Sequence, residues 1–342
     1  MSYVQSAQHI VIGAGAWGTA LAIMLARDGQ PVHLVTRSDE KAQQINAVRK
    51  NVSALPSIRL PESLLAYSVA QESALQDSLT RAPEAVVLLA MPAQATRQAV
   101  RDLAPLLSSG HRLVITAKGL ERGTQQMMST VVAQEASGQT VGVLSGPSFA
   151  HDVAKGLPTA VTLAAPSIEM AQALCVDLQG SNFRPYASDD LIGVQLGGAL
   201  KNVLAIAAGV VEGKGLGESA KAALITRGFA ELSRLAISQG AHAETLVGLS
   251  GLGDLVLTCS TAGSRNFAFG HSLGQGNKPD DLLQNGQPLA EGAKTAAAAL
   301  DLGRANNIDM PITQTVADIV EGDMSVDQAI AALMARPLKR EH

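Results

Sequence analysis

The 342-residue chain has very few cysteines and aromatic residues. Its two cysteines, Cys175 and Cys259, are too few for a disulfide framework, and neither lies in a metal-ligand spacing. Aromatic residues make up only 3% of the chain, so the core must be built from Ala, Leu, Val and Ile. This composition is typical of a protein from a reducing compartment, and we predict no metal site.

The sequence also lacks a strong charge excess and a membrane-spanning apolar run. A formal net charge of −4 gives no reason to expect nucleic-acid binding. The longest apolar candidate, residues 191–211, is interrupted by Gln195, Lys201 and Asn202, so no run approaches the roughly 18 residues of a spanning helix. Residues 1–8 have neither the basic nor the apolar region of a signal peptide. We therefore predict a soluble protein of a reducing compartment, without membrane insertion.

The clearest motif lies near the N-terminus, where a β-branched run meets a glycine pattern. Residues 10–12 read Ile-Val-Ile, and Gly13, Gly15 and Gly18 follow before a helical pattern begins. Strand, G-x-G-x-x-G and helix in this order are typical of a dinucleotide site, with the glycines serving the tight turn, the approach of the pyrophosphate and the helix–strand packing. The alternative is an ordinary glycine-rich turn in a chain with 32 glycines. The flanking strand and helix favour the nucleotide site.

The end of the second predicted strand, residues 31–35, indicates which nucleotide is bound. NAD-binding domains place an acidic residue near this point. Here Arg37 stands at the strand tip, and Asp39 and Glu40 come slightly later. Because arginine can pair with a 2′-phosphate and stack on adenine, we predict that NADP(H) is preferred and that NAD(H) is possible. The alternative is a solvated Arg37 with the two acidic side chains turned inward.

The length of the chain and its patterns indicate two domains. Strand and helix patterns alternate up to residue 188, with a buried strand at 112–116 and a helix at 124–136, and only helical patterns follow. The predicted fold class is therefore α/β, with an N-terminal Rossmann-type doubly wound sheet and an all-helical C-terminal domain. We predict a dinucleotide-binding domain over residues 1–188 and a helical, substrate-binding and catalytic domain over residues 189–342.

Two charged residues of the helical part stand in apolar surroundings. Lys201 lies within a predicted apolar helix, so it should either meet an anion or reach water with its head group. Asp254, between glycines and leucines, needs a cationic or donor partner, which Lys201 would supply. Seven scattered histidines offer no better acid or base, so a lysine oriented by a carboxylate is the predicted proton carrier.

A third candidate cluster is Ser264, Arg265 and Asn266. It places a hydroxyl, a guanidinium group and an amide on one short segment, which suits an oxyanion such as a phosphate. The alternative is a helix start, in which Ser264 is the N-cap and Arg265 is solvated.

Together these motifs resemble a known family, the bacterial-type NAD(P)-dependent glycerol-3-phosphate dehydrogenases. The resemblance runs in order from about residue 10 to about residue 334 and includes six segments: Gly13–Ala22, Lys118–Leu120, Ser145–Ala150, Leu200–Asn202, Gly251–Leu255 and Ser264–Asn266. One departure is Phe267, which stands where bacterial members commonly carry a second basic residue, and it puts one charge contact in doubt.

The resemblance implies a reaction and roles for three residues. The reaction is the reversible reduction of dihydroxyacetone phosphate to sn-glycerol 3-phosphate, which supplies glycerophospholipid synthesis. Lys201 would donate a proton to the carbonyl oxygen on reduction, Lys118 would stabilise the charge on that oxygen, and Asp254 would orient Lys201.

The resemblance also implies the binding residues and the assembly. The substrate would contact Lys118, Gly146, Ser148, Lys201, Asn202, Asp254, Ser264, Arg265 and Asn266. The cofactor would contact Gly13, Gly15, Ala16, Trp17, Gly18, Arg37, Lys118, Ala150, Arg265, Leu289 and Glu291. The family's site lies between its two domains, and its members are commonly cytoplasmic homodimers.

Two other functions remain to be weighed. A two-domain Rossmann dehydrogenase of the β-hydroxyacid or ketopantoate reductase type also uses a helix-borne Lys-Asn pair, but residues 145–150 and 264–266 suit a phosphorylated substrate better. A nucleotide sensor without turnover would need no proton donor, so Lys118, Lys201 and Asp254 argue against it.

Overall fold

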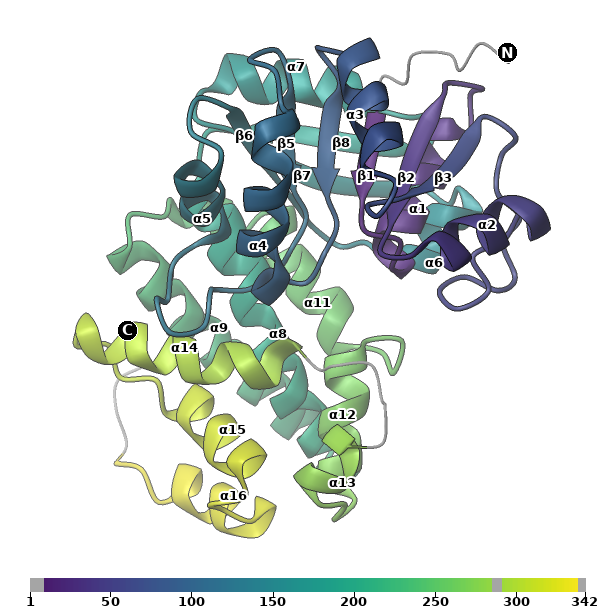
Figure 1. Ribbon diagram of the computed structural model, residues 1–342. Coiled ribbons are helices and arrows are strands. Elements are labelled where there is room, and N and C mark those ends of the chain that lie inside the picture. Colours follow the sequence, from purple (N-terminus) through teal and green to yellow (C-terminus); the bar gives the residue numbers. More distant parts are fainter. Residues whose placement is uncertain (1–8, 285–290, 338–342) are drawn as a thin grey trace. The chain divides into compact units, whose positions relative to one another are not determined.

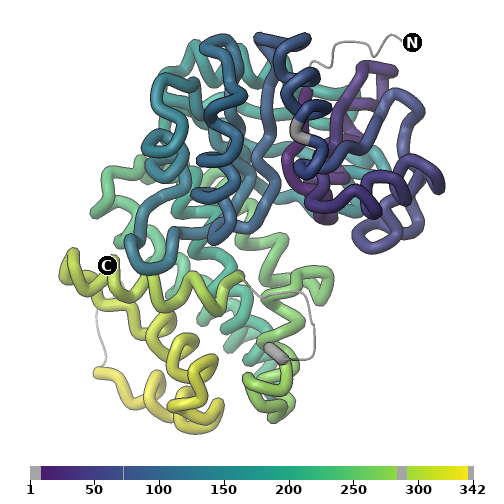
Figure 2. Tube along the Cα trace, viewed as in Figure 1, coloured from purple at the N-terminus to yellow at the C-terminus, as the bar shows by residue number. Residues whose placement is uncertain are grey.

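The computed structural model describes residues 9–284 and 291–337. The chain divides into two compact units, which we name the sheet unit (residues 1–121 and 126–195) and the helical unit (residues 122–125 and 196–342). Figure 2 shows the order along the chain, with the purple-to-teal part in the sheet unit and the green-to-yellow part in the helical unit. The sheet unit thus ends slightly beyond residue 188, where the sequence patterns change.

The sheet unit is built on a doubly wound sheet (Figure 1). Its order in the described part of the chain is β3-β2-β1-β4-β5-β6-β7-β8. The strands are β1 (His9–Ile12), β2 (Val32–Thr36), β3 (Leu64–Ser68), β4 (Val86–Leu89), β5 (Arg112–Ile115), β6 (Thr140–Ser145), β7 (Thr159–Ala164) and β8 (Phe183–Ser188). All neighbours pair in parallel except β6 and β7. The order reverses between β1 and β4, and ligands of such sheets bind beyond the carboxyl ends of the strands at that point.

Helices cover both faces of this sheet because successive strand residues point to opposite sides. On one face α1 (Ala16–Ala26), α2 (Asp39–Val48), α6 (Ala150–Lys155) and α7 (Ile168–Leu178) share a buried cluster with strand residues such as Val11 and Leu34. On the other face α3 (Glu72–Arg81), α4 (Ala93–Leu103) and α5 (Met128–Glu135) pack against Ile10, Ile12 and their neighbours. This arrangement confirms the predicted Rossmann-type fold.

The helix predicted over residues 124–136 begins later than the sequence pattern indicates. Helix α5 starts at Met128. Gly123 and Gln125 have positive φ angles of 88° and 54°, which a right-handed helix does not allow. The residues before α5 instead form a paired turn, in which Leu120 bridges Met127.

The helical unit is arranged around the apolar helix α8 (Leu191–Gly213), whose first residues belong to the sheet unit. The other helices are α9 (Glu218–Ser238), α10 (Ala243–Leu246), the π-helical turn η2 (Leu249–Gly253), α11 (Asp254–Cys259), α12 (Arg265–Gly274), α13 (Pro279–Gln284), α14 (Glu291–Ala305), α15 (Pro311–Glu321) and α16 (Val326–Met334). Asp190 caps α8 by accepting a hydrogen bond from Gly193 N–H at 2.7 Å. By length and composition α8 could span a membrane, but its most apolar window is fully buried, as in a core helix.

Glycines bring α8 and α12 into backbone contact. A Cβ on Gly270 would lie 2.0 Å from the Ile206 carbonyl oxygen, and one on Gly209 would lie 2.1 Å from that of Phe267. Both positions therefore exclude any larger residue in this packing. The close approach lets short side chains on the two helices, such as Asn202 and Asn266, form a hydrogen bond.

Candidate active site

Packing explains two of the three glycines in the first turn of the sheet unit. Gly13 has φ +115°, and a Cβ there would lie 2.6 Å from the Ala90 carbonyl oxygen. A Cβ on Gly18 would lie 1.9 Å from the Gly13 oxygen. Gly15 is different, because a Cβ at this position would meet no atom within 4 Å. The open space over Gly15 is what the approach of a pyrophosphate requires.

The start of α1 fits a phosphate group as well. The N-cap is Gly15, so no side chain caps the start of this helix. Both Gly15 and Ala16 are exposed. The first N–H groups of such a helix form an anion-binding end. In the described part of the chain Trp17 Nε1 is a buried donor without a hydrogen-bond partner. The turn and the helix start together fit a bound dinucleotide.

Two residues that the sequence motif does not reveal hold this turn in place. Asn51 is buried, and its Nδ2 donates to the Ala14 carbonyl oxygen at 3.0 Å and to Thr19 Oγ1 at 2.8 Å. Lys41 Nζ donates to the same Ala14 oxygen at 3.1 Å. Both lie more than twenty residues away in sequence, so no local pattern indicates them.

Arg37 follows the end of β2 directly and its side chain is exposed. Ser38 caps α2 by accepting a hydrogen bond from Lys41 N–H at 3.4 Å. Asp39 and Glu40 lie in the first turn of α2, where negative charge complements the helix dipole. The two acidic residues therefore have a helix-stabilising role, and Arg37 remains the charged residue at the strand tip.

Lys118, Gly146 and Ser148 lie together in the sheet unit. Lys118 Nζ donates to the Gly146 carbonyl oxygen at 3.2 Å, and Ser148 Oγ donates to the same oxygen at 2.9 Å. Gly146 has φ +147°, and a Cβ there would lie 2.8 Å from Cα of Val161. Ala150, the first residue of α6, is partly buried. Three predicted substrate residues are thus close neighbours.

The helical unit buries the lysine–aspartate pair expected from the sequence. Lys201 is 6% exposed, and its Nζ donates to Asp254 Oδ1 at 2.5 Å. The expectation that Lys201 meets an anion is therefore confirmed. Nζ also donates to Thr258 Oγ1 at 2.6 Å. Thr258 was missed in the sequence, although it follows Asp254 by one helical turn and so shares its face of α11.

Cys259 is buried beside this pair. Burial raises the pKa of its thiol to about 12. The thiol therefore stays protonated at neutral pH and is no nucleophile. Lys201, Asp254 and Thr258 remain the polar groups of this part of the site.

Two neighbouring asparagines form a second buried polar contact. Asn266 Nδ2 donates to Asn202 Oδ1 at 3.0 Å, and Asn266 Oδ1 accepts from Gly292 N–H at 2.9 Å. The structure thus brings together Asn202 and Asn266, which are both predicted to contact the substrate. Glu291 precedes Gly292 as the first residue of α14, whereas Leu289 lies outside the described residues.

The start of α12 confirms the helix-start interpretation of residues 264–266, and the oxyanion site stays a prediction. Ser264 is the N-cap, and its Oγ accepts from Phe267 N–H at 3.3 Å. Arg265 is the first helical residue and is exposed. A cation at a helix N-terminus interacts unfavourably with the helix dipole. The stability of α12 therefore does not by itself favour an arginine at this position. Phe267 is buried, so the side chain that departs from the family pattern belongs to the core.

The fold and these groups define a class of protein. A doubly wound sheet with a dinucleotide turn and a buried lysine–aspartate pair on helices is the arrangement of an NAD(P)-dependent dehydrogenase. Such an enzyme takes a hydride from its nicotinamide cofactor and exchanges a proton through a side chain.

Comparison with known proteins identifies the family. Residues 9–171 match the model for the NAD-dependent glycerol-3-phosphate dehydrogenase N-terminus, and residues 190–331 match that for the C-terminus. The chain belongs to this family. Relatives named glycerol-3-phosphate dehydrogenase, NAD(P)+, include one from a Bradyrhizobium species, which is 52% identical over 332 residues, and one from Parvibaculum lavamentivorans, which is 48% identical over 331 residues. Each alignment covers 97% of both chains.

A solved structure agrees with this assignment. The crystal structure of glycerol-3-phosphate dehydrogenase from Coxiella burnetii has a TM-score of 0.88 and is 39% identical. It covers 96% of this chain and 98% of its own. The similarity therefore extends over both units rather than over the nucleotide fold alone.

Proposed function

We propose that the protein catalyses the reversible NAD(P)H-dependent reduction of dihydroxyacetone phosphate to sn-glycerol 3-phosphate. The observation that carries this proposal is the buried contact of Lys201 Nζ with Asp254 Oδ1 at 2.5 Å, in a chain about half identical to enzymes named for this substrate. A protonated lysine held by a carboxylate is a suitable acid for a carbonyl oxygen.

The nicotinamide supplies the hydride when the cofactor is bound, and the protein moves the proton. During reduction Lys201 donates a proton to the carbonyl oxygen, and in the reverse direction it accepts this proton. Asp254 and Thr258 hold the lysine head group in place. Lys118 stabilises the negative charge that develops on the same oxygen.

Polar groups at two places hold the rest of the substrate. In the helical unit, Arg265 pairs with the phosphate, and Ser264 and Asn266 contact its oxygens or the neighbouring hydroxyl groups together with Asn202. In the sheet unit, Gly146 and Ser148 contact the substrate near Lys118. The exposed Arg265 at the start of α12 supports this assignment.

The cofactor contacts are proposed mainly from the first turn and the adjoining strand ends. They comprise Gly13, Gly15, Ala16, Trp17, Gly18, Arg37, Lys118, Ala150, Arg265, Leu289 and Glu291. The exposed Arg37 after β2 supports a preference for NADP(H), with NAD(H) as a possible second cofactor. A reductase of the ketopantoate type needs no site for a substrate phosphate. The cluster at residues 264–266 therefore favours the dehydrogenase with a phosphorylated substrate over this alternative.

Assembly and cellular role follow as further parts of the proposal. The enzyme would act in the cytoplasm as a homodimer and supply glycerol 3-phosphate for glycerophospholipid synthesis. Sedimentation of the purified chain at several concentrations tests the dimer, because a monomer mass at all concentrations would contradict it.

The test of the proposed function is the steady-state oxidation of NADPH, and in parallel of NADH, by the purified protein. Dihydroxyacetone phosphate is the substrate, and unphosphorylated dihydroxyacetone is the control. We expect turnover only with the phosphate ester and a higher kcat/KM with NADPH. Nucleotide binding without turnover of either compound would contradict the proposal.

A further inference from the structure

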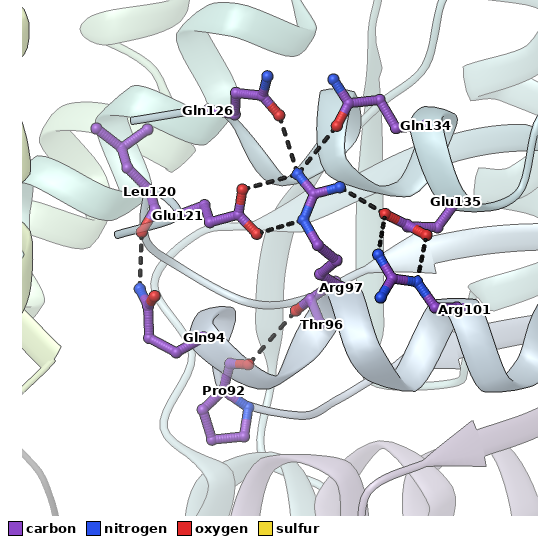
Figure 3. Close-up of polar contacts among 10 residues, drawn as sticks. All are labelled: Pro92, Gln94, Thr96, Arg97, Arg101, Leu120, Glu121, Gln126, Gln134 and Glu135. Carbon is purple, nitrogen blue, oxygen red and sulfur yellow. Dashed lines mark hydrogen bonds and ion pairs between the residues drawn. The ribbon is translucent and has the colours of Figure 1, made fainter. Parts of the chain in front are cut away.

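A cluster of charged side chains surrounds Arg97 on α4 (Figure 3). Arg97 Nε and Nη2 donate to the two carboxylate oxygens of Glu121 at 2.7 and 2.8 Å. Nη1 donates to Glu135 Oε1 at 2.5 Å. The side chain of Arg97 is 26% exposed, and those of Glu121 and Glu135 are each 13% exposed. This is a more enclosed arrangement than an isolated surface ion pair, which contributes little.

The cluster fixes a particular segment of the chain, residues 116–127 between β5 and α5. Nη2 of Arg97 also donates to Gln126 Oε1 at 3.1 Å, so one guanidinium group holds Glu121 and Gln126 together. These two residues are paired through the backbone as well, because Glu121 N–H donates to the Gln126 oxygen at 2.9 Å. Gln94, one turn before Arg97, donates to the Leu120 carbonyl oxygen at 2.8 Å. Both strands of the turn are thus attached to α4.

Lys118 lies on this same segment, between two anchored positions. Before it, Thr116 N–H and Oγ1 both donate to the Leu89 carbonyl oxygen at 3.1 Å. After it, Leu120 and Glu121 contact Gln94 and Arg97. A lysine side chain has many rotamers, so the location of its ammonium group depends on how firmly its backbone is held.

We propose that Arg97 is a positioning residue of the reaction, which fixes the segment carrying Lys118 and thereby the ammonium group that stabilises the carbonyl oxygen. This inference rests on the proposed function. Arginine suits the task because its planar fork binds a carboxylate at two points and keeps further donors for Gln126 and Glu135. The hydrogen bonds of Arg97 go to other side chains of the protein, so its proposed effect on the reaction passes through Lys118.

Arg101 provides a matched control for this proposal. It lies one helical turn after Arg97 on α4 and pairs with the same Glu135, through Nε at 2.9 Å. In the described part of the chain its hydrogen bonds go to Glu135 and not to the segment of residues 116–127. Arg101→Gln therefore removes a comparable charge and a comparable ion pair from the same helix but leaves the contacts to Glu121 and Gln126.

The first test is hydrogen exchange of peptides that cover residues 116–127. Arg97→Gln should increase exchange of these amides by about tenfold, whereas Arg101→Gln should leave them unchanged. No change in Arg97→Gln, or an equal increase in both variants, would overturn the proposal. This readout does not depend on the activity of the enzyme.

The second test is kinetic and uses the wild type, Arg97→Gln, Arg97→Lys, Lys118→Ala and the double variant Arg97→Gln/Lys118→Ala. Arg97→Gln should lower kcat with dihydroxyacetone phosphate roughly 10- to 100-fold, without a change in NADPH affinity, and Arg97→Lys should recover part of it. In the Lys118→Ala background, Arg97→Gln should change kcat by less than about twofold, because both act through one group.

Multiplied losses in the double variant would show that Arg97 acts independently of Lys118 and would overturn the proposal. A wild-type enzyme without turnover of dihydroxyacetone phosphate would contradict the proposed function instead. In that case the exchange comparison would still decide whether Arg97 orders the segment.

Discussion

At the scale of single residues, the buried charge pair of Lys201 and Asp254 is a costly feature. Taking two charges out of water costs several kcal/mol per ion, which their attraction only partly offsets. An apolar pair of the same volume would serve the core of the helical unit at least as well. The pair is therefore better explained by proton transfer than by stability. Thr258 supplies a further acceptor for the lysine head group.

Arg265→Ala tests the proposed phosphate contact. Removing a guanidinium group that pairs with a phosphate should cost about 2 kcal/mol, so KM for dihydroxyacetone phosphate should rise by about 30-fold. Steady-state kinetics at saturating NADPH measures this, with Arg304→Ala, another exposed arginine of the helical unit, as the control. An unchanged KM in Arg265→Ala would show that the phosphate binds elsewhere.

His33 provides a prediction about stability and pH. Burial lowers the pKa of His33 from 6.5 to about 4, and its Nδ1 hydrogen-bonds with Ser78 Oγ. The unfolded chain therefore takes up a proton near pH 6.5, which the folded chain does only near pH 4. The stabilising contribution is present above pH 6.5 and is lost as the pH falls towards 4, by about 3 kcal/mol in total.

Urea unfolding at several pH values between 7 and 4.5 measures this effect. His33→Gln should flatten the dependence of the unfolding free energy on pH. His151→Gln, which removes an exposed histidine, should leave the dependence as in the wild type. Equal slopes for the wild type and His33→Gln would contradict the prediction.

Residue-level prediction succeeded where a charge had no local partner. Lys201 and Asp254 each lie in an apolar segment without a charged neighbour. Because a buried charge needs a partner of opposite charge, the sequence indicated that the two residues pair. Thr258 gave no such signal, because a helical hydroxyl can bond to its own backbone. Asn51 and Arg97 were also missed, since their partners lie far away in the sequence and polar side chains such as theirs are ordinarily solvated.

At the scale of elements, we propose that the junction of β2 and α2 sets the cofactor preference. Arg37 stands at the strand tip, while Asp39 and Glu40 belong to the first helical turn. Arg37→Asp should raise KM for NADPH roughly 10- to 100-fold and leave KM for NADH unchanged or lower, because a carboxylate repels the 2′-phosphate and accepts the ribose hydroxyl.

Steady-state kinetics with both cofactors measures this preference, and Arg59→Asp is a control at an exposed position of the same unit. An equal loss with NADPH and NADH would contradict the role of Arg37 in binding the 2′-phosphate.

Strands were easier to predict than the boundaries of helices. Buried parallel strands are apolar throughout, so β4 and β5 stand out in the sequence. The start of α5 was misplaced because the left-handed positions at Gly123 and Gln125 interrupt an otherwise helical pattern. The short helix α11 was not predicted, and the start of α12 was given only as an alternative from its N-cap Ser264, since a hydrophobic period cannot be recognised over six to ten residues.

At the scale of the whole molecule, the sequence could predict which unit carries which functional motif. The first carries the nucleotide motif, and the second carries the lysine–aspartate pair. The backbone contact of α8 and α12 could not be predicted, because a glycine that permits close packing looks the same in sequence as one that permits a turn.

The central claim is that this chain reduces dihydroxyacetone phosphate with Lys201 as its proton donor. The most direct measurement compares NADPH oxidation by the wild type, Lys201→Met and Lys201→Arg at saturating substrate, with NADPH binding measured on the same samples. Lys201→Met removes the charge and the ion pair with Asp254, whereas Lys201→Arg keeps the charge but cannot release a proton. We predict that kcat falls roughly 10²- to 10⁴-fold in both variants while NADPH binding persists. Turnover near the wild-type rate in either folded variant would contradict the account.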